Sequence, residues 1–465
     1  MTPEEFRRYG HQLVDWLADY HRDIEELPVV PSVAPGEIRA ALPMAPPEAG
    51  EDFAEIFSDF RELIAPGMCH WGHPGWMAYF PSNSSPPSVL GEMLTAGFGA
   101  QCMSWVTSPA ATELEQVVMS WYRQMLGLPD TFTGVIQDTA STSTLIAFLT
   151  ARERAGADPS RLVGYWSGES HSSVAKAARL AGIPIDRRRV VPVDRRFAMV
   201  PSALEAMMAE DVANGLVPGI VVATAGTTSS TAVDPLAAIG EIARRHGAWF
   251  HIDAAYGGSA AIVPEFRWVL EGAEFADSLV ANPHKWLLTT FDCSAYFVRD
   301  VPALLQTFSA TPEYLRSAYD HDSAAVNFRD WGIALGRRFR ALKLWFVLRS
   351  YGVAALQEVV RRHVALGREL ASWVEAEPEF ELLAPAPLAL VCLRHVPAAL
   401  AGDEAALARH NAAIVERVNA GREVHINHTS LGGRYAIRVA LANFRTERRH
   451  VERLWELIRA AAAEP

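Results

Sequence analysis

Near the start of the chain, hydrophobic and polar positions follow the spacing of a helix in two separate stretches. Both place aromatic and aliphatic residues three or four positions apart, in EFRRYGHQLVDWLADYHRDI (residues 5–24) and EDFAEIFSDFRELI (51–64). The stretch between them, residues 31–50, contains too many prolines to be helical. Because two such helices cannot form a core of their own, we expect them to pack on another domain or on a second copy of the chain. A homodimer is the simpler assumption.

From residue 86 the pattern changes to short apolar runs rich in β-branched residues, with amphipathic helical stretches between several of them. Strands are predicted for residues 134–137, 162–166, 189–193, 219–225, 248–254 and 278–282. This alternation is typical of an α/β fold whose mostly parallel sheet carries helices on both faces. In such a fold we expect the ligand site at the carboxyl ends of the strands.

The rest of the chain predicts a lid and a second, smaller domain. Residues 309–331 show no sustained periodicity, as in loops that act as lids. A long helix is predicted around residues 335–352, and strands at 388–394 and 435–441. We therefore expect three parts, which are an N-terminal helical dimerisation segment (1–85), a large domain (86–345) and a small C-terminal α/β domain (346–465).

Composition and charge narrow the classes of function. Half of the 465 residues are hydrophobic, which is typical of a globular protein with a large core and two or three domains. The formal net charge of -12, with no pronounced basic stretch, argues against a general nucleic-acid binder. Chemistry on a small molecule is the better expectation.

Cysteine usage and apolar runs bear on metal binding and on the compartment. The cysteines, Cys69, Cys102, Cys293 and Cys392, lie far apart without the spacing of a zinc site, so no metal is predicted. They are expected to be buried thiols in a reducing cytoplasm. MTPEEFRRYG lacks the apolar core of a secretion signal, and no run of about 18 apolar residues follows, so we expect a cytoplasmic protein without a membrane segment.

Two predicted strand ends bring a carboxylate and an amine to one edge of the sheet. Asp253 ends the strand in HIDAAYGGSA, although a turn or helix-capping acid is the alternative interpretation. Lys285 follows the next strand, in NPHKWLLTTFDC, although lysine is rarely buried. A partly desolvated amine can form a Schiff base, and a pyridine ring held in that way needs a carboxylate beside its nitrogen. Asp253 and Lys285 together meet both requirements.

Two further strand ends offer an anion site and a histidine. Thr139, Ala140 and Ser141 follow a strand and lead into a helix whose free N–H groups favour a phosphate, although Ser/Thr clusters are most often plain helix caps. His171, in SGESHSSVAKA, lies between a strand and a helix. It is either a capping residue or a ring that stacks on a cofactor and transfers a proton.

Six motifs together resemble one family, the pyridoxal-phosphate-dependent aromatic L-amino acid decarboxylases of group II. The resemblance covers essentially the whole chain and implies fold type I, that of aspartate aminotransferase, with pyridoxal 5'-phosphate as the cofactor. The motifs that carry it are HIDAAYGGSA, NPHKWLLTTFDCSA, ESHSSVAKA, VIQDTASTSTL, ATAGTTSSTAVD and LGRRFRALKLWFV.

The resemblance also implies roles in cofactor binding. Lys285 would carry the cofactor as a Schiff base and Asp253 would pair with its ring nitrogen. His171 would stack over the ring, with Ala255 against the other face. The residues that would hold the phosphate or surround the pair are Ala140, Ser141, Asn282, His284 and Thr228.

The family's substrate pocket draws on HWGHPGWMAYFPSNSS, residues 70–85. By resemblance, the residues that would line the slot for the aromatic side chain are Trp71, Tyr79, Phe80 and Pro81. Met103 would enter the slot from the partner subunit. Gly336 stands where plant relatives selective for tyrosine carry serine, which favours a roomy slot that accepts indole or catechol rings. Phenylalanine, tyrosine, tryptophan and their hydroxylated forms all stay open as substrates.

One position departs from the amine-forming pattern. The family's lid carries a tyrosine, taken to return a proton, where this chain has Phe328 in VNFRDW. Phenylalanine has no proton to give. The same exchange is found in plant aromatic aldehyde synthases, which lose carbon dioxide, use oxygen and release aldehyde, ammonia and hydrogen peroxide. We therefore expect aldehyde formation. The alternative is amine release, with Phe328 as an apolar lid residue and His171 or water as the proton source.

Two other classes of function compete with this prediction. An aminotransferase of the same fold needs an arginine clamp for the substrate carboxylate, and Arg438 is available, although a site that releases carbon dioxide would avoid such a clamp. A binding or scaffold module would have no use for Lys285, Asp253 and His171 together.

Overall fold

A computed structural model describes residues 1–310, 312–319, 322 and 324–464 of the chain. Its centre is a seven-stranded sheet in the order β1-β7-β6-β5-β4-β2-β3. The strands are β1 (Thr133–Gln137), β2 (Leu162–Ser167), β3 (Arg188–Val191), β4 (Val217–Thr224), β5 (Trp249–Asp253), β6 (Ser278–Ala281) and β7 (Ser294–Val298). β7 pairs antiparallel with both β1 and β6, whereas the pairs from β6 through β5, β4 and β2 to β3 are parallel. The predicted mostly parallel sheet is confirmed.

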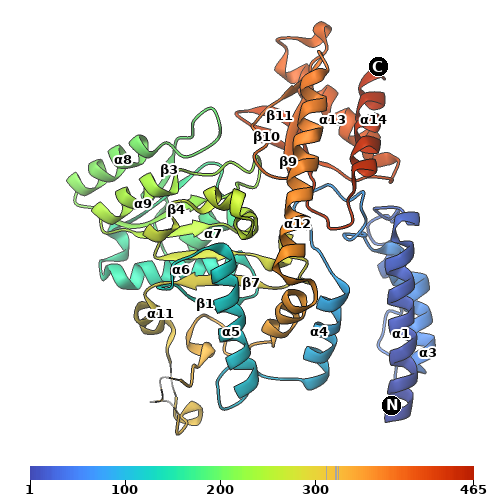
Figure 1. Cartoon of the computed structure of the whole chain (residues 1–465), viewed down its shortest axis with the longest axis horizontal. Helices are drawn as coiled ribbons and strands as arrows, with labels where there is room; N and C mark the ends of the chain where they lie inside the picture. Colours follow the sequence, from blue (N-terminus) through green and yellow to red (C-terminus); the bar gives the residue numbers. More distant parts are fainter. Residues whose placement is uncertain (311, 320–321, 323, 465) are drawn as a thin grey trace.

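Alternate residues of the strands point into two separate apolar clusters, one on each face of the sheet. In β1, Val135 belongs to one cluster and Ile136 to the other, and in β4 Val222 and Val221 divide in the same way. Helices cover both faces, as Figure 1 shows. The helices of this large domain are α4 (Pro86–Phe98), α5 (Pro109–Leu126), α6 (Ala140–Ala155), α7 (Ser172–Leu180), α8 (Pro201–Ala213), α9 (Leu236–Arg245), α10 (Pro283–Trp286) and α11 (Val301–Phe308).

The two predicted N-terminal helices are present and lie against each other at the edge of the molecule (Figure 1). α1 (Pro3–Asp23) and α3 (Phe53–Asp59), which continues as a π-turn over Phe60–Ile64, meet through aromatic rings. The ring centroids of Trp16 and Phe60 are 5.3 Å apart, and those of Tyr9 and Phe53 are 4.7 Å apart. The proline-rich stretch between them, predicted to be non-helical, contains one short helix, α2 (Glu37–Ala41).

The C-terminal part is a second α/β unit. Its four antiparallel strands lie in the order β10-β11-β9-β8, with bounds β8 (Phe380–Leu382), β9 (Leu390–His395), β10 (Asn427–Leu431) and β11 (Arg434–Ala440). Helices α13 (Glu404–Ala420) and α14 (Arg448–Ala463) pack on each other beside it. The long helix α12 (Arg340–Ala376) joins the two units and kinks at Gly352, where φ is 71°. The expected domain boundary at residue 346 therefore falls inside a helix, and the division into domains stays a prediction.

No helix in the described ranges is long and apolar enough to cross a membrane. The lid predicted for residues 309–331 contains two single 3₁₀ turns, Glu313–Leu315 and Phe328–Asp330. Residues 311, 320, 321 and 323 of that lid lie outside the described residues. Cytoplasmic location stays a prediction.

Gly257, a few residues beyond the end of β5, is required by close packing. A Cβ at this position would lie 2.3 Å from the carbonyl oxygen of Ala225, which belongs to the backbone and cannot move aside easily. We expect Gly257→Ala to destabilise the protein by about 1–3 kcal/mol, the usual cost of overpacking. The measurement is the melting temperature, with Gly10→Ala in α1 as the control, because a methyl group there meets no atom within 4 Å. An equal melting temperature for both variants would contradict the packing argument.

Candidate active site

Five strand ends meet at one small cavity of about 220 Å³ at the carboxyl edge of the sheet. It lies beyond β1, β2, β4, β5 and β6, where the shared direction of these strands places the residues that follow them. Nine residues that the sequence singles out for cofactor binding line this cavity. They are Ala140, Ser141, His171, Thr228, Asp253, Ala255, Asn282, His284 and Lys285.

Lys285 lies on α10, a single turn after β6, and the surrounding chain holds that turn firmly. The side-chain amide of Asn83 donates to the Lys285 carbonyl at 2.8 Å, and Trp286 Nε1 donates to His363 Nδ1 at 2.9 Å. Burial lowers the pKa of the Lys285 amine, and the nearby Asp253 carboxylate opposes part of that effect. An amine with a lowered pKa is more often deprotonated and is therefore the better nucleophile.

Asp253 is the last residue of β5, and its side chain is only 5% exposed. One carboxylate oxygen, Oδ1, accepts a hydrogen bond from the Ala255 N–H at 3.1 Å. Thr224 is its neighbour on β4, and the Thr224 hydroxyl is buried without a hydrogen-bond partner among the described residues. Burying a carboxylate beside an unpaired hydroxyl is costly, so this pair favours a ligand with a hydrogen-bond donor that faces Asp253.

The N-terminus of α6 forms the anion side of the cavity. Its first N–H groups, those of Ala140 and Ser141, have no carbonyl partner within the helix. Asn282 and His284 also line the cavity. Asn282 Oδ1 accepts from Ser294 at 2.7 Å, and His284 Nδ1 accepts from the Cys293 N–H at 2.9 Å. Burial lowers the pKa of His284 to about 3, so this ring is neutral and its remaining nitrogen is a donor.

His171 caps α7 and lies at the mouth of the cavity. Its Nδ1 accepts a hydrogen bond from the Ser173 N–H at 3.2 Å, which leaves the proton of the neutral ring on Nε2. Burial is the main reason that the pKa of His171 is lowered, with Lys285 acting in the same direction and Asp253 against it. The capping and catalytic interpretations of His171 are therefore compatible, because capping fixes the tautomer that can donate from Nε2.

A second cavity of about 570 Å³ adjoins the first and is the candidate slot for the substrate side chain. The two share Phe80, His284, Lys285 and Phe291. The predicted slot residues Trp71 and Pro81 also line it. Tyr79 does not appear among the described lining residues of either cavity, because its side chain turns outward, is 53% exposed and stacks on Trp71 at 5.9 Å.

Met103, Phe328 and Gly336 lie together, away from both cavities as the described residues define them. The Arg329 N–H donates to the Met103 carbonyl at 2.8 Å, and a Cβ on Gly336 would approach Gln101 at 3.5 Å. Phe328 is only 3% exposed, and the Arg337 guanidinium lies 4.8 Å from its ring centroid. Within one chain, then, the lid phenylalanine is not placed next to Lys285.

Arg438, the possible carboxylate clamp, is 2% exposed and is bonded to backbone carbonyls. Its Nε donates to Thr228 at 3.0 Å and its Nη1 donates to Tyr79 at 2.7 Å, while Nη2 is buried without an acceptor among the described residues. It lines neither cavity within the described part of the chain. Arg438 therefore ties the backbone of Tyr79 to that of Thr228, and two of its nitrogens are engaged by the protein rather than open to a substrate carboxylate.

Several residues that line the cavities gave no signal in the sequence. Thr224, Gly226, Tyr256 and Phe291 belong to the first cavity, and Tyr20, His21, Cys69, Ser82 and Arg445 contribute to the second. Tyr20 and His21 belong to the N-terminal segment and Arg445 to the C-terminal one. Only the fold brings these distant parts together.

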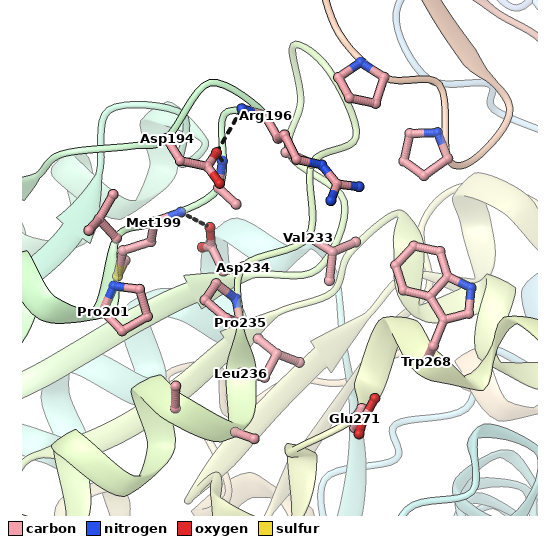
Figure 2. Close-up of a pocket in the computed structure, with 17 residues that line it drawn as sticks. Asp194, Arg196, Met199, Pro201, Val233, Asp234, Pro235, Leu236, Trp268 and Glu271 are labelled. Atoms are coloured by element: carbon pink, nitrogen blue, oxygen red, sulfur yellow. Dashed lines mark hydrogen bonds between the residues drawn. The ribbon is translucent and has the colours of Figure 1, made fainter.

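A wider groove of about 700 Å³ lies elsewhere on the surface, between the loops after β3 and β4 (Figure 2). None of the predicted site residues lines it. Its two aspartates hold the loops themselves, because Asp194 accepts from the Arg196 N–H at 2.7 Å and Asp234 accepts from the Met199 N–H at 2.7 Å. Among the described residues, no group of three or more His, Cys, Asp or Glu side chains is arranged to hold a metal ion.

The donor set of the first cavity fits pyridoxal phosphate. Lys285 can take the aldehyde, Asp253 can face the ring nitrogen, and the start of α6 can hold the phosphate. The small side chain of Ala255 leaves space for a flat ring. A fold of this topology with such a site defines the class of pyridoxal-phosphate-dependent enzymes.

Comparison with known proteins narrows the class. The model of the pyridoxal-dependent decarboxylase conserved domain matches residues 35–396. The chain is 42% identical over 476 residues to a phenylacetaldehyde synthase of Arabidopsis thaliana, covering 100% of this chain and 97% of that protein. It is 43% identical over 477 residues to tryptophan decarboxylase 2 of Oryza sativa subsp. japonica, covering 100% and 96%. The crystal structure of an Oryza sativa TDC with PLP and tryptamine matches with a TM-score of 0.97 at 37% identity, covering 99% of this chain and 98% of that one.

The chain belongs to the pyridoxal-dependent decarboxylase family, within the group II enzymes that act on aromatic amino acids. It is a carboxy-lyase of the aromatic amino acid decarboxylase or aldehyde synthase class, and its cofactor is pyridoxal 5'-phosphate. The fold type and the cofactor expected from the sequence are thereby confirmed. The relatives include both amine-forming and aldehyde-forming enzymes, so family membership leaves the product open.

Proposed function

We propose that this decarboxylase converts an aromatic L-amino acid into the corresponding aromatic acetaldehyde. In the balanced reaction, one amino acid, one oxygen and one water give one aldehyde, one carbon dioxide, one ammonia and one hydrogen peroxide. The observation that carries the proposal is Phe328, which stands at the lid position where a tyrosine would return a proton to the substrate Cα. Without that proton the Cα is left open to oxygen.

The residues of the first cavity would divide the work of binding. Lys285 would hold the cofactor covalently, Asp253 would keep its ring nitrogen protonated, and Ala140, Ser141 and Asn282 would bind its phosphate. When bound, the cofactor supplies an electron sink for the bond that breaks. The protein's part is orientation, because His171 and Ala255 lie where they can fix the plane of the ring.

The neighbouring residues Met103, Phe328 and Gly336 would act on the active site of the partner subunit. They lie together and outside the two site cavities of their own chain, so this part of the molecule could face a second copy. Phe328 is buried against its own chain, so the lid would have to move for that ring to reach the partner's cavity. The exposed N-terminal aromatic residues, such as Phe6 with 70% exposure, offer the surface for that contact. A homodimer with shared active sites unites these observations.

A second candidate is the simple decarboxylase, which releases the aromatic amine. It is favoured by His171, because the neutral ring carries its proton on Nε2 and lies at the cavity. If His171 returns the proton to the substrate Cα, the lid phenylalanine has no influence on the product. Whether oxygen is a co-substrate therefore depends on whether His171 or the lid residue faces the substrate Cα.

The proposal is tested by measuring four compounds in one reaction. We expect the wild-type enzyme to release carbon dioxide and to consume oxygen in equal amounts, with aldehyde as the organic product and amine as a minor one. Carbon dioxide, oxygen, amine and aldehyde are measured in the same vessel. Stoichiometric amine without oxygen uptake would refute the aldehyde proposal and leave the decarboxylase in place. Keto acid formed without carbon dioxide would instead identify an aminotransferase.

A further inference from the structure

The side-chain slot is lined by a guanidinium and, among the described residues, by no carboxylate. Among the described residues that line it, none is an aspartate or glutamate, while Arg445 and Lys285 both contribute. Lys285 belongs to the shared wall with the cofactor cavity. Arg445 lines only the slot, so its charge bears on what the slot accepts.

Not every N–H group of Arg445 has a hydrogen-bond acceptor among the described residues. Its Nη2 pairs with His21 Nδ1 at 2.9 Å and its Nη1 donates to the His21 carbonyl at 3.3 Å. Its Nε is buried without an acceptor among the described residues. A guanidinium carries five N–H groups and cannot accept a hydrogen bond. Glu25 of the N-terminal segment forms an ion pair with Arg449 instead, at 2.8 Å.

The contact with Arg445 also sets the tautomer of His21. Arginine is always a donor, so His21 Nδ1 must accept, and the proton of the neutral ring lies on Nε2. Burial and the Arg445 charge both lower the pKa of His21, which keeps the ring neutral. Two neighbouring side chains of the slot therefore present N–H donors.

We propose that Arg445 and His21 form a subsite that selects aromatic amino acids with a hydroxylated ring, of the phenol or catechol type. A ring oxygen accepts hydrogen bonds from these donors, whereas a plain phenyl ring leaves them unpaired and an indole N–H offers no acceptor. The aromatic side chains of Trp71, Phe80 and Phe291 line the same slot and suit the body of the ring. This inference rests on the proposed function, because it assumes that the slot receives the substrate side chain.

The test compares L-tyrosine with L-phenylalanine in the holoenzyme. For the wild type we expect kcat/KM for carbon dioxide release to be higher with tyrosine. In Arg445→Met, kcat/KM for tyrosine should fall by about 10- to 100-fold, the scale of a lost hydrogen bond to a charged group, while that for phenylalanine changes less than about twofold. His21→Phe, which keeps a ring in place, should reduce the same preference by about tenfold if Arg445→Met does not fold.

Arg449→Met is the matched control, because it breaks a comparable tie between the C-terminal part and Glu25 without lining the slot. We expect it to leave the tyrosine preference unchanged. Calorimetric binding of tyramine and phenethylamine gives a readout besides activity, and only tyramine should bind more weakly to Arg445→Met. Equal losses for both substrates and both amines, or a wild-type preference for phenylalanine, would overturn the subsite. If no aromatic amino acid releases carbon dioxide in the wild type, the proposed function itself fails.

Discussion

Lys285→Ala is expected to lower carbon dioxide release by about a thousand-fold or more, because a catalytic group that acts as part of a unit is not replaced by its neighbours. The amine is the group proposed to bind the cofactor covalently, and Asp253, which lines the same cavity, would keep the cofactor ring charged. The variant should also lose the visible absorbance of the covalently bound cofactor. In the wild type, borohydride reduction should fix the cofactor to the peptide that contains Lys285.

The small number of lysines leaves few alternative sites for the covalent bond to the cofactor. The chain contains only Lys176, Lys285 and Lys343. Lys343 is fully buried and its Nζ lies 3.0 Å from Glu92, and Lys176 lies exposed on α7. Lys176→Ala is therefore the control and should keep both the absorbance and the activity. A reduced adduct on Lys343, or full activity of Lys285→Ala, would contradict the assignment of the cofactor lysine.

The sheet could be predicted well from the sequence because buried parallel strands appear as short continuous apolar runs. β2, β4, β5 and β6 lie within a few residues of their expected positions. β7 (Ser294–Val298) gave no separate signal, because it is buried on both faces and follows an apolar run. Its antiparallel direction depends on pairing with β1 and β6, which are far apart in sequence.

The cofactor cavity was predictable for a related reason. Chain direction places the residues after parallel strands at one edge, so the order of strands and helices along the chain is enough to assign Asp253, Lys285 and His171 to one site. The slot was only half predictable, because Tyr20, His21 and Arg445 reach it through the packing of α1 against the C-terminal part. No local pattern encodes such a contact.

The place of Phe328 marks the limit of what a single sequence encodes. Its residue type is the ground for the aldehyde proposal, which assumes that the ring reaches a substrate. In the folded chain it packs instead against Trp331, with ring centroids 5.4 Å apart. A lid that serves another subunit depends on quaternary structure, which a single sequence does not specify.

Phe328→Tyr is expected to shift the product from aldehyde toward amine and to reduce oxygen uptake. A positioned proton donor typically contributes about 10²- to 10⁴-fold to a proton-transfer step, which is enough to outcompete oxidation at the substrate Cα. The substitution should be tolerated, because Phe328 borders a cavity of about 240 Å³ that can take a hydroxyl group. The amine-to-aldehyde ratio and the oxygen electrode trace are measured together for variant and wild type.

Phe308→Tyr is the matched control for this change. Phe308 packs against the same apolar cluster as Phe328, so both variants add one hydroxyl group to the same part of the fold. We expect Phe308→Tyr to keep the wild-type ratio of aldehyde to amine, because only the residue at position 328 is proposed to face the substrate. If Phe328→Tyr still gave aldehyde with full oxygen uptake, the lid residue would not determine the product, and the proton would have to be controlled at His171. A ratio that moves only in Phe328→Tyr would assign the choice between amine and aldehyde to that ring.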